Sequence, residues 1–407
     1  MATFIGYSQQ YLIATFFVVF IFSFLFENKV FKNKFSSLYL GFFALFVAYY
    51  GSVTIINFFS GVITLVDFAN FFIKYLLMPV TIYLLVPMKK KDIIKTIKII
   101  RNIIIISALY GLVEVIFKHN VLDRFILIPG GWTENHTMSG NYKPSSFFLH
   151  YNYYGFVLNI GFLLVSEYPI KNKYFNSIIK LLFITQIFIA QSRINRICFL
   201  VVSIYYLIKI FRKNTKKGMM TVSFCFGSFL ILLFIPGFFN NIQNIIIGRI
   251  LPLITNGMSE GSIGQRLGTL RNFKYFFLDD PILGLIGGGF GSIEEIFLVK
   301  YSFFENVSTA DCQLTTFLVE AGVIGTILFS LFIILKLFKK SRTHEDNVIK
   351  LLIIVFLIDS ITLDIVSNNF LMCVFVSFYS LVEQSKKSHQ NIARRVCLKE
   401  SRLNVFY

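Results

Sequence analysis

Charged residues are scarce in this chain, and acidic residues are the scarcer kind. Only 15% of the 407 residues are charged, with 21 acidic and 39 basic side chains, while 56% are hydrophobic. Soluble domains carry about 25% charged residues, so the composition excludes an ordinary soluble protein. The net charge of +18 does not indicate nucleic acid binding, because membrane proteins gather Lys and Arg in their cytoplasmic loops. We therefore predict a polytopic membrane protein.

Cysteines are few, and we expect no cleavable leader sequence. The five cysteines are odd in number and lie in or beside apolar segments or in the tail, so no disulfide framework is expected. The N-terminal sequence MATFIGYSQQ has no basic region of the kind that precedes a cleavable signal. We interpret the apolar segment that follows it as a retained span.

Several catalytic motifs are absent from the sequence. It has no H-E-x-x-H, no Cys/His metal spacing and no G-x-S-x-G, so we predict neither a metal ion nor a cofactor nor a serine hydrolase. Glycines cluster at 284–291 without a strand–GxGxxG–helix context or a Walker motif, which argues against a nucleotide site. We expect these glycines to permit a tight turn and a close backbone approach after the break at DDP.

Apolar segments of the length that crosses a bilayer, about 20 residues, recur along the chain. They lie near 7–26, 38–59, 64–86, 93–117, 148–166, 175–191, 194–211, 218–239, 312–335, 348–364 and 366–383. The predicted fold is an all-α polytopic membrane protein with about 11 (roughly 10–12) transmembrane helices.

The basic loops alternate along the chain, and the positive-inside rule places them in the cytoplasm. The N-terminus is then outside and the C-terminus inside. The predicted parts are N-terminal spans (1–117), an outer loop (118–147), central spans (148–239), a large outer loop (240–311), C-terminal spans (312–383) and a basic cytoplasmic tail (384–407).

Cations also occur on the outer side, where this rule predicts few. Arg193 and Arg196 lie at a tight outer turn between the sixth and seventh spans, and the large outer loop contains Arg249, Arg266, Arg271, Lys274 and Lys300. A cation at mid-bilayer costs roughly 2.5–3.5 kcal/mol. These side chains therefore either snorkel to lipid headgroups or hold an anion. For Lys300 and Arg249, a surface pair with Glu294 or Glu295 is the alternative.

Ionisable residues inside the predicted spans leave a transport function open. Asp67 and Lys74 are seven residues apart and share a helix face, and Asp359 and Asp364 lie near the outer end of the tenth span. Buried charges mark ion and proton pathways in many transporters. Against this interpretation, water is available near that end, and the halves of the chain show no internal repeat.

Four stretches between about 140 and 335 occur in the order found in a known family. They are YKPSSFFLHYNYYG, QSRINRICFL, GQRLGTLRNFKYFFLDDPILGLIGGGFGS and STADCQLTTFLVEAGVIGTILFSLFII. Together they resemble the bacterial O-antigen polymerases (Wzy-type) and the related O-antigen ligases. The first departs from the family pattern at Lys143, where Arg is usual, and at Tyr151, where Pro is usual. Asp311 stands where ligases typically carry His, which favours a polymerase.

The resemblance implies a GT-C-like membrane glycosyltransferase in the bacterial inner membrane, with its active site facing the periplasm. Its substrate would be a glycan on undecaprenyl pyrophosphate, transferred to the non-reducing end of another lipid-linked repeat unit. The alternatives are a ligase that moves glycan to lipid A–core and, from a different class, a polysaccharide flippase or transporter. Membrane lipid and a polysaccharide chain-length regulator are expected partners, and nucleic acid is not.

The resemblance and the electrostatics of this reaction together assign the site residues. Negative charge develops on the bridging oxygen as the sugar–phosphate bond breaks, and guanidinium groups bind phosphate bidentately. Arg193 and Arg266 are predicted to hold the pyrophosphate, and Asp311 to act as general base, although an Asp at a helix N-terminus is also a common cap. The predicted substrate-binding residues are Arg196, Arg271, Lys143, His150 and Asn152.

Overall fold

The computed structural model describes residues 38–72, 90–120, 142–148, 150–190, 192–216, 261–302, 312–341 and 343–363, with a few residues in 219–223 and 365–382. Every regular element in this part of the chain is a helix, which confirms the all-α fold for the described residues. The first predicted span, nearly all of the eighth, and Lys74, Arg249, Asp311 and Asp364 lie outside them.

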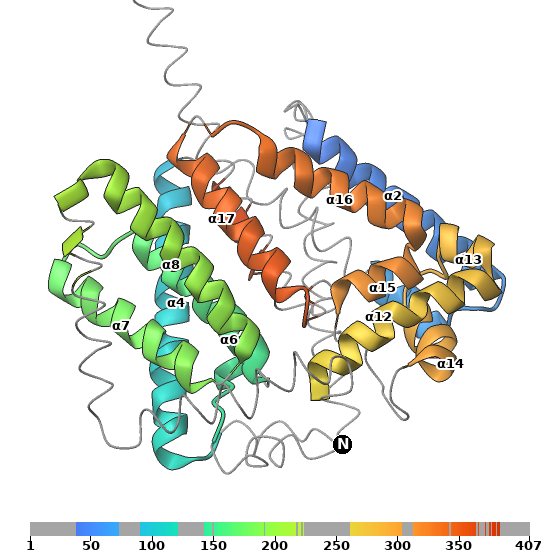
Figure 1. The fold of residues 1–407 in the computed structure, drawn as a ribbon, viewed down its shortest axis with the longest axis horizontal. Coiled ribbons are helices and arrows are strands. Elements are labelled where there is room, and N and C mark those ends of the chain that lie inside the picture. The colour runs from blue at the N-terminus through green and yellow to red at the C-terminus, as the bar shows by residue number, and fades with distance from the viewer. Residues whose placement is uncertain are drawn as a thin grey trace, which may run out of the picture.

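Most described helices coincide with predicted spans to within a few residues. They are α2 (Leu38–Phe59), α4 (Lys90–Phe117), α6 (Tyr151–Glu167), α7 (Lys173–Ile189), α8 (Arg193–Lys213) and α17 (His344–Asp359), shown in Figure 1. Within this part of the chain, two helices, Lys91–Phe117 and Arg193–Arg212, are long and apolar enough to cross a membrane. Both expose large aliphatic side chains, such as Ile106 and Leu200.

The predicted large outer loop contains several helices between residues 261 and 301. It contains α12 (Gly261–Asp279), α13 (Pro281–Ile286), the π-helix η5 (Ile293–Leu298) and α14 (Val299–Tyr301). We call residues 261–301 the outer unit. The DDP sequence marks a break as predicted, since Asp280 caps α13 by accepting a hydrogen bond from the Leu283 N–H, and Pro281 begins the helix.

The ninth predicted span is wrong as a single helix. Residues 313–320 form α15 (Gln313–Glu320) and residues 322–338 form α16 (Gly322–Phe338), with a break at Ala321. Gly322 has φ +66°, and a Cβ there would lie 2.3 Å from the Leu285 carbonyl oxygen. The break therefore depends on a glycine that lies against the outer unit, a contact that hydropathy does not register.

The helix ends sort into two groups. At one end of the bundle, Glu167 of α6 contacts Lys209 of α8 at 3.0 Å and His344 of α17 at 3.3 Å. At the other end, the Gln313 N–H of α15 donates to the carbonyl of Ser360, directly after α17. We call the second group the outer ends, after the side to which the charge pattern assigns them; they lie toward the bottom and right of Figure 1.

Aromatic side chains join α2 to the broken helix. The Phe46 ring lies 5.3 Å from that of Phe317 on α15 and 5.2 Å from that of Phe329 on α16, between ring centroids. All three side chains are buried. Because aromatic pairs add to the free energy of packing, this cluster fixes α15 beside α2 and leaves its other face toward α12 and α17.

Candidate functional site

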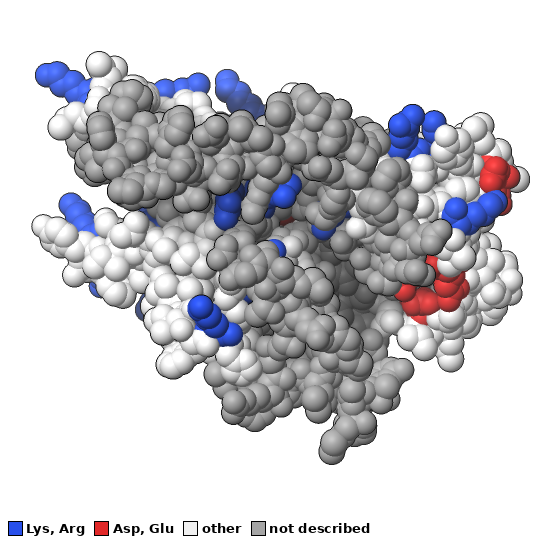
Figure 2. Space-filling view, turned by 60° about the horizontal axis from the view of Figure 1, so that its bottom comes forward, with Lys and Arg blue, Asp and Glu red and all other residues white. Residues whose placement is uncertain are grey.

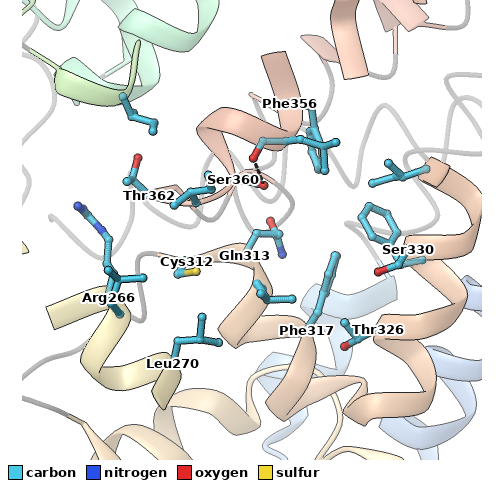
Figure 3. A pocket seen from close by; sticks show the side chains of 17 residues that line it. Arg266, Leu270, Cys312, Gln313, Phe317, Thr326, Ser330, Phe356, Ser360 and Thr362 are labelled. Atoms are coloured by element: carbon cyan, nitrogen blue, oxygen red, sulfur yellow. Dashed lines mark hydrogen bonds between the residues drawn. The ribbon is translucent and has the colours of Figure 1, made fainter. Parts of the chain in front are cut away.

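A cavity of about 430 Å³ lies where α8, α12, α15, α16 and α17 meet near their outer ends. Its walls are mostly apolar and include Ile194, Phe317, Phe329 and Phe356. The polar lining consists of Arg266, Gln313, Thr326, Ser330, Ser360 and Thr362 (Figure 3). A mostly apolar cavity with a few polar groups is the usual form of a small-molecule site.

Among the described residues, Arg266 contributes the cationic side chain of this cavity. It lies on the buried face of α12, with only 9% of its surface exposed. In Figure 3 its guanidinium end and the Thr362 side chain lie on the same side of the cavity, away from Thr326 and Ser330. A guanidinium beside apolar space is suited to a ligand that joins an anionic group to an apolar body.

The outer end of α8 borders the same cavity. Ser192 directly precedes the helix, Arg193 is its first residue, and Ile194 lines the cavity. The Arg193 side chain is exposed and does not itself line it. The structure thus places both predicted pyrophosphate-binding arginines on helices that border one cavity, with one side chain facing it and the other at the surface.

Arg196 contributes to the turn between α7 and α8. Its Nη2 donates a 2.6 Å hydrogen bond to the carbonyl of Phe188, and its guanidinium lies 5.6 Å from the centre of the Phe188 ring. The turn itself is as tight as predicted, since α7 ends at Ile189 and α8 begins at Arg193. The geometry favours a structural contact for Arg196 over a substrate contact.

A buried network of amides fixes the start of α8 against α6. The Asn195 amide donates to the Asn152 carbonyl at 3.0 Å and to Ser192 Oγ at 2.7 Å, and the Asn159 amide donates to the Asn195 carbonyl at 3.1 Å. A Cβ on Gly155 would lie 2.1 Å from the Asn195 amide nitrogen. Asn152 therefore acts here through its backbone carbonyl, as a support for the helix that carries Arg193.

Lys143 and His150 lie together, and neither lines the cavity. The Lys143 ammonium lies 4.6 Å from the centre of the Tyr151 ring, and the His150 ring stacks on the same tyrosine at 4.5 Å. His150 Nδ1 accepts the Asn152 N–H at 3.2 Å and so caps α6. The structure groups these two predicted residues with each other and not with Arg266.

Arg271 and Lys300 are exposed on the outer unit. Arg271 is not part of the cavity lining. Lys300 forms an ion pair of 2.8 Å with Asp279, so the alternative of a surface pair applies to Lys300, with Asp279 as the partner in place of Glu294 or Glu295. Lys300 and Tyr301 both donate to Asp279, and these hydrogen bonds lower the pKa of its carboxyl group.

Glu114, near the outer end of α4, is a buried carboxylate that we did not single out from the sequence. It is 1% exposed and accepts the N–H groups of Ser145 and Ser146 at 2.9 and 2.7 Å, and the Tyr142 hydroxyl at 2.7 Å. It thus binds the segment 142–148, which we call the serine loop. The sequence signal that could have identified Glu114 is a single acidic residue within an apolar helical segment.

Glu320, at the end of α15, is the second such carboxylate. It is 3% exposed, accepts the Gly291 N–H at 2.8 Å and accepts the Tyr50 hydroxyl. The N–H groups of Gly288 and Gly289 donate to the carbonyls of Val319 and Glu320, each at 2.9 Å. Residues 287–291, the glycine loop, therefore satisfy the end of α15, which confirms the expected close backbone approach.

No family model matches this chain, and no curated protein or solved structure is significantly similar to it. The likeness to O-antigen polymerases consequently depends on the four sequence stretches alone. Each of the four contributes to the features above: the serine loop with Lys143, the start of α8, the outer unit with Arg266, and α15 with Glu320.

Proposed function

We propose that this chain is a surface-polysaccharide polymerase of the bacterial inner membrane. It would transfer a growing glycan from undecaprenyl pyrophosphate to the non-reducing end of another lipid-linked repeat unit, at the periplasmic face. About eleven membrane spans, an outer N-terminus and a cytoplasmic tail belong to the same proposal. It draws on the sequence resemblance together with one structural observation.

That observation is the position of Arg266. Its side chain is buried at the edge of a mostly apolar cavity, among helix ends of the predicted outer side. A lipid-linked pyrophosphate suits this cavity, because a guanidinium binds phosphate oxygens bidentately and the apolar walls can take the apolar chain of the lipid.

In the proposed reaction the bond between the anomeric carbon and the pyrophosphate oxygen breaks, and the acceptor hydroxyl oxygen forms the new bond to that carbon. The electron pair of the broken bond stays on the pyrophosphate, and Arg266 stabilises that charge. Arg193, at the positive end of α8, adds a second cation nearby. The proton of the acceptor hydroxyl goes to a general base, for which Asp311 is the candidate; it directly precedes Cys312, which lines the cavity.

The test is complementation of a polymerase-deficient bacterium, read as the ladder of polysaccharide chain lengths. We expect Arg266→Ala to lower the polymerisation rate by about 10²–10³-fold, the usual loss on removing a donor to a developing anion, and so to leave single repeat units. Arg193→Ala should shorten the ladder similarly. Arg266→Lys should retain part of the activity, because the charge survives and the planar fork does not.

The matched control is Arg212→Ala, which removes an exposed arginine from the opposite end of α8. It should leave the ladder unchanged, and membrane levels of all variants should be equal by immunoblot. A full ladder from Arg266→Ala excludes this arginine from the reaction. If deleting the gene removes even the single repeat from lipid A–core, the activity is that of a ligase.

A further inference from the structure

The outer unit has an exposed face that combines apolar, aromatic and basic side chains. On α12 the exposed residues Leu267, Arg271, Lys274, Tyr275 and Leu278 lie at positions i, i+4, i+7, i+8 and i+11. This spacing places them on one side of the helix. Arg266, Thr269 and Phe276 lie buried on the other side.

The apolar part of this face extends over α13 and α14. Leu278 is 72% exposed, Ile282 69% and Val299 81%. In Figure 2 the right-hand part, which holds the outer unit, is mostly white, the colour of all residues other than Lys, Arg, Asp and Glu, with a few basic and acidic side chains around it. A large exposed apolar surface of this kind marks a contact with a membrane or with another protein.

Continuity with the membrane helices decides between these two partners. α13 packs against α16, and the Tyr49 hydroxyl of α2 donates to the Ile286 carbonyl at 2.9 Å. The neighbouring outer ends of α2 and α16 are themselves apolar and exposed, at Phe59 and at Ile327. The apolar face of the outer unit therefore continues the surface that these helices present to lipid in a membrane.

The basic and aromatic residues occupy the positions expected at a lipid headgroup boundary. The Lys274 ammonium lies 4.5 Å from the centre of the Tyr275 ring, and Arg271 is exposed one turn before Tyr275. Tyr, Lys and Arg are enriched at this boundary, because their stems remain in apolar surroundings while their polar ends reach headgroups. We propose that the exposed face of α12 and α13 lies in the headgroup region of the outer leaflet, with Arg271 and Lys274 at lipid phosphates.

This placement follows from the exposed surface and from the predicted orientation of the chain, and it does not depend on the polymerase activity. It carries a consequence for the cavity. Arg266 lies on the opposite side of the same helix, so a helix lying along the headgroups would hold Arg266 at the depth of a lipid phosphate.

The test uses the full-length protein in phosphatidylcholine vesicles. Trp132 is the only tryptophan of the chain, so Trp132→Phe gives a background without tryptophan. Leu278→Trp and Ile282→Trp each add one at an exposed site, where no packed neighbour has to move. Glu295→Trp, at an exposed acidic position of the same unit, is the control.

We expect lipids brominated near the headgroup end of the acyl chain to reduce the emission of the first two variants about twofold, since an interfacial ring lies about 5–10 Å deep. The control should be quenched by aqueous iodide and not by these lipids. Iodide quenching at Leu278→Trp and Ile282→Trp without lipid quenching would overturn the proposal in favour of an aqueous face. Protection from both quenchers would overturn it in favour of a protein partner.

Discussion

The serine loop and the glycine loop are both bound by a buried carboxylate near an outer helix end, but by different means. Glu114 receives two backbone N–H groups on separate oxygens, Ser145 on one and Ser146 on the other. Glu320 receives one backbone N–H and one hydroxyl. The glycine loop adds direct contacts between backbones, which the serine loop does not need.

The glycines explain this difference. Gly287, Gly289 and Gly291 all have positive φ, and a Cβ on Gly287 would lie 2.4 Å from the Glu320 carbonyl oxygen. The serine loop has no glycine, and its one strained residue is Ser146 at φ +52°. The close backbone contacts of the glycine loop leave no room for a side chain at Gly287, whereas every residue of the serine loop carries one.

Gly287→Ala should have the largest effect. It adds about 1–3 kcal/mol of backbone strain and a methyl group where α15 already lies. We expect the outer unit to separate from α15, with a fall in the thermal unfolding temperature in detergent and loss of the polysaccharide ladder.

Gly61→Ala is the matched control, because Gly61 also has positive φ but nothing lies within 4 Å of its added Cβ. It should show the backbone strain alone. If Gly287→Ala and Gly61→Ala had equal unfolding temperatures, the backbone contact between the glycine loop and α15 would not contribute to the effect of Gly287→Ala.

Glu114→Gln should destabilise the protein more than Glu320→Gln. Both oxygens of Glu114 face N–H groups, which cannot reverse, so one donor is left buried against the new NH₂ at a cost of about 1–3 kcal/mol. At Glu320 the amide can still accept from Gly291 and donate to Tyr50, because a hydroxyl accepts as well as donates. The unfolding temperatures of the two variants measure this difference in stability. A larger fall for Glu320→Gln than for Glu114→Gln would contradict the prediction.

Asp279→Asn should have the smallest effect, because this carboxylate and Lys300 are exposed and their pairing is weakened by solvent and salt. The lowered pKa of Asp279 gives the sign: its contribution is present above the ordinary pKa of Asp and is lost as pH falls through the lowered value. We expect a slight drop in unfolding temperature at neutral pH and low salt, which disappears at high salt. If Asp279→Asn lowered the unfolding temperature as much as Glu114→Gln does, the exposure of a carboxylate would not determine how much it stabilises the protein.

Helices were predictable where an apolar run ends in basic residues. The start of α8 at Arg193 and the end of α4 at Phe117 follow from hydropathy and charge alone, because bilayer thickness fixes the length of such runs. The break before Gly322 was not predictable, since it depends on a contact with residues 285–287, far away in the sequence.

The candidate site was predictable by residue type and only partly by place. Arginines on the outer side pointed to an anion, and Arg266 does line a cavity. Lys143 and His150 have the right chemistry for a substrate, yet their short-range contacts with Tyr151 place them elsewhere. Side-chain partners of this kind follow from loop conformation, which sequence spacing does not determine.

The shortness of α15 bears on how the chain is assembled. With 8 residues, α15 is about 12 Å long, so it does not cross a bilayer core of about 30 Å, and its end carbonyls need the N–H groups of the glycine loop. Synthesis proceeds from the N-terminus, so residues 287–291 are made before residues 319–320 and are present when α15 folds. In a circular permutant with α15 ahead of the outer unit, the carbonyls of Val319 and Glu320 would be made before the N–H groups of the glycine loop that donate to them.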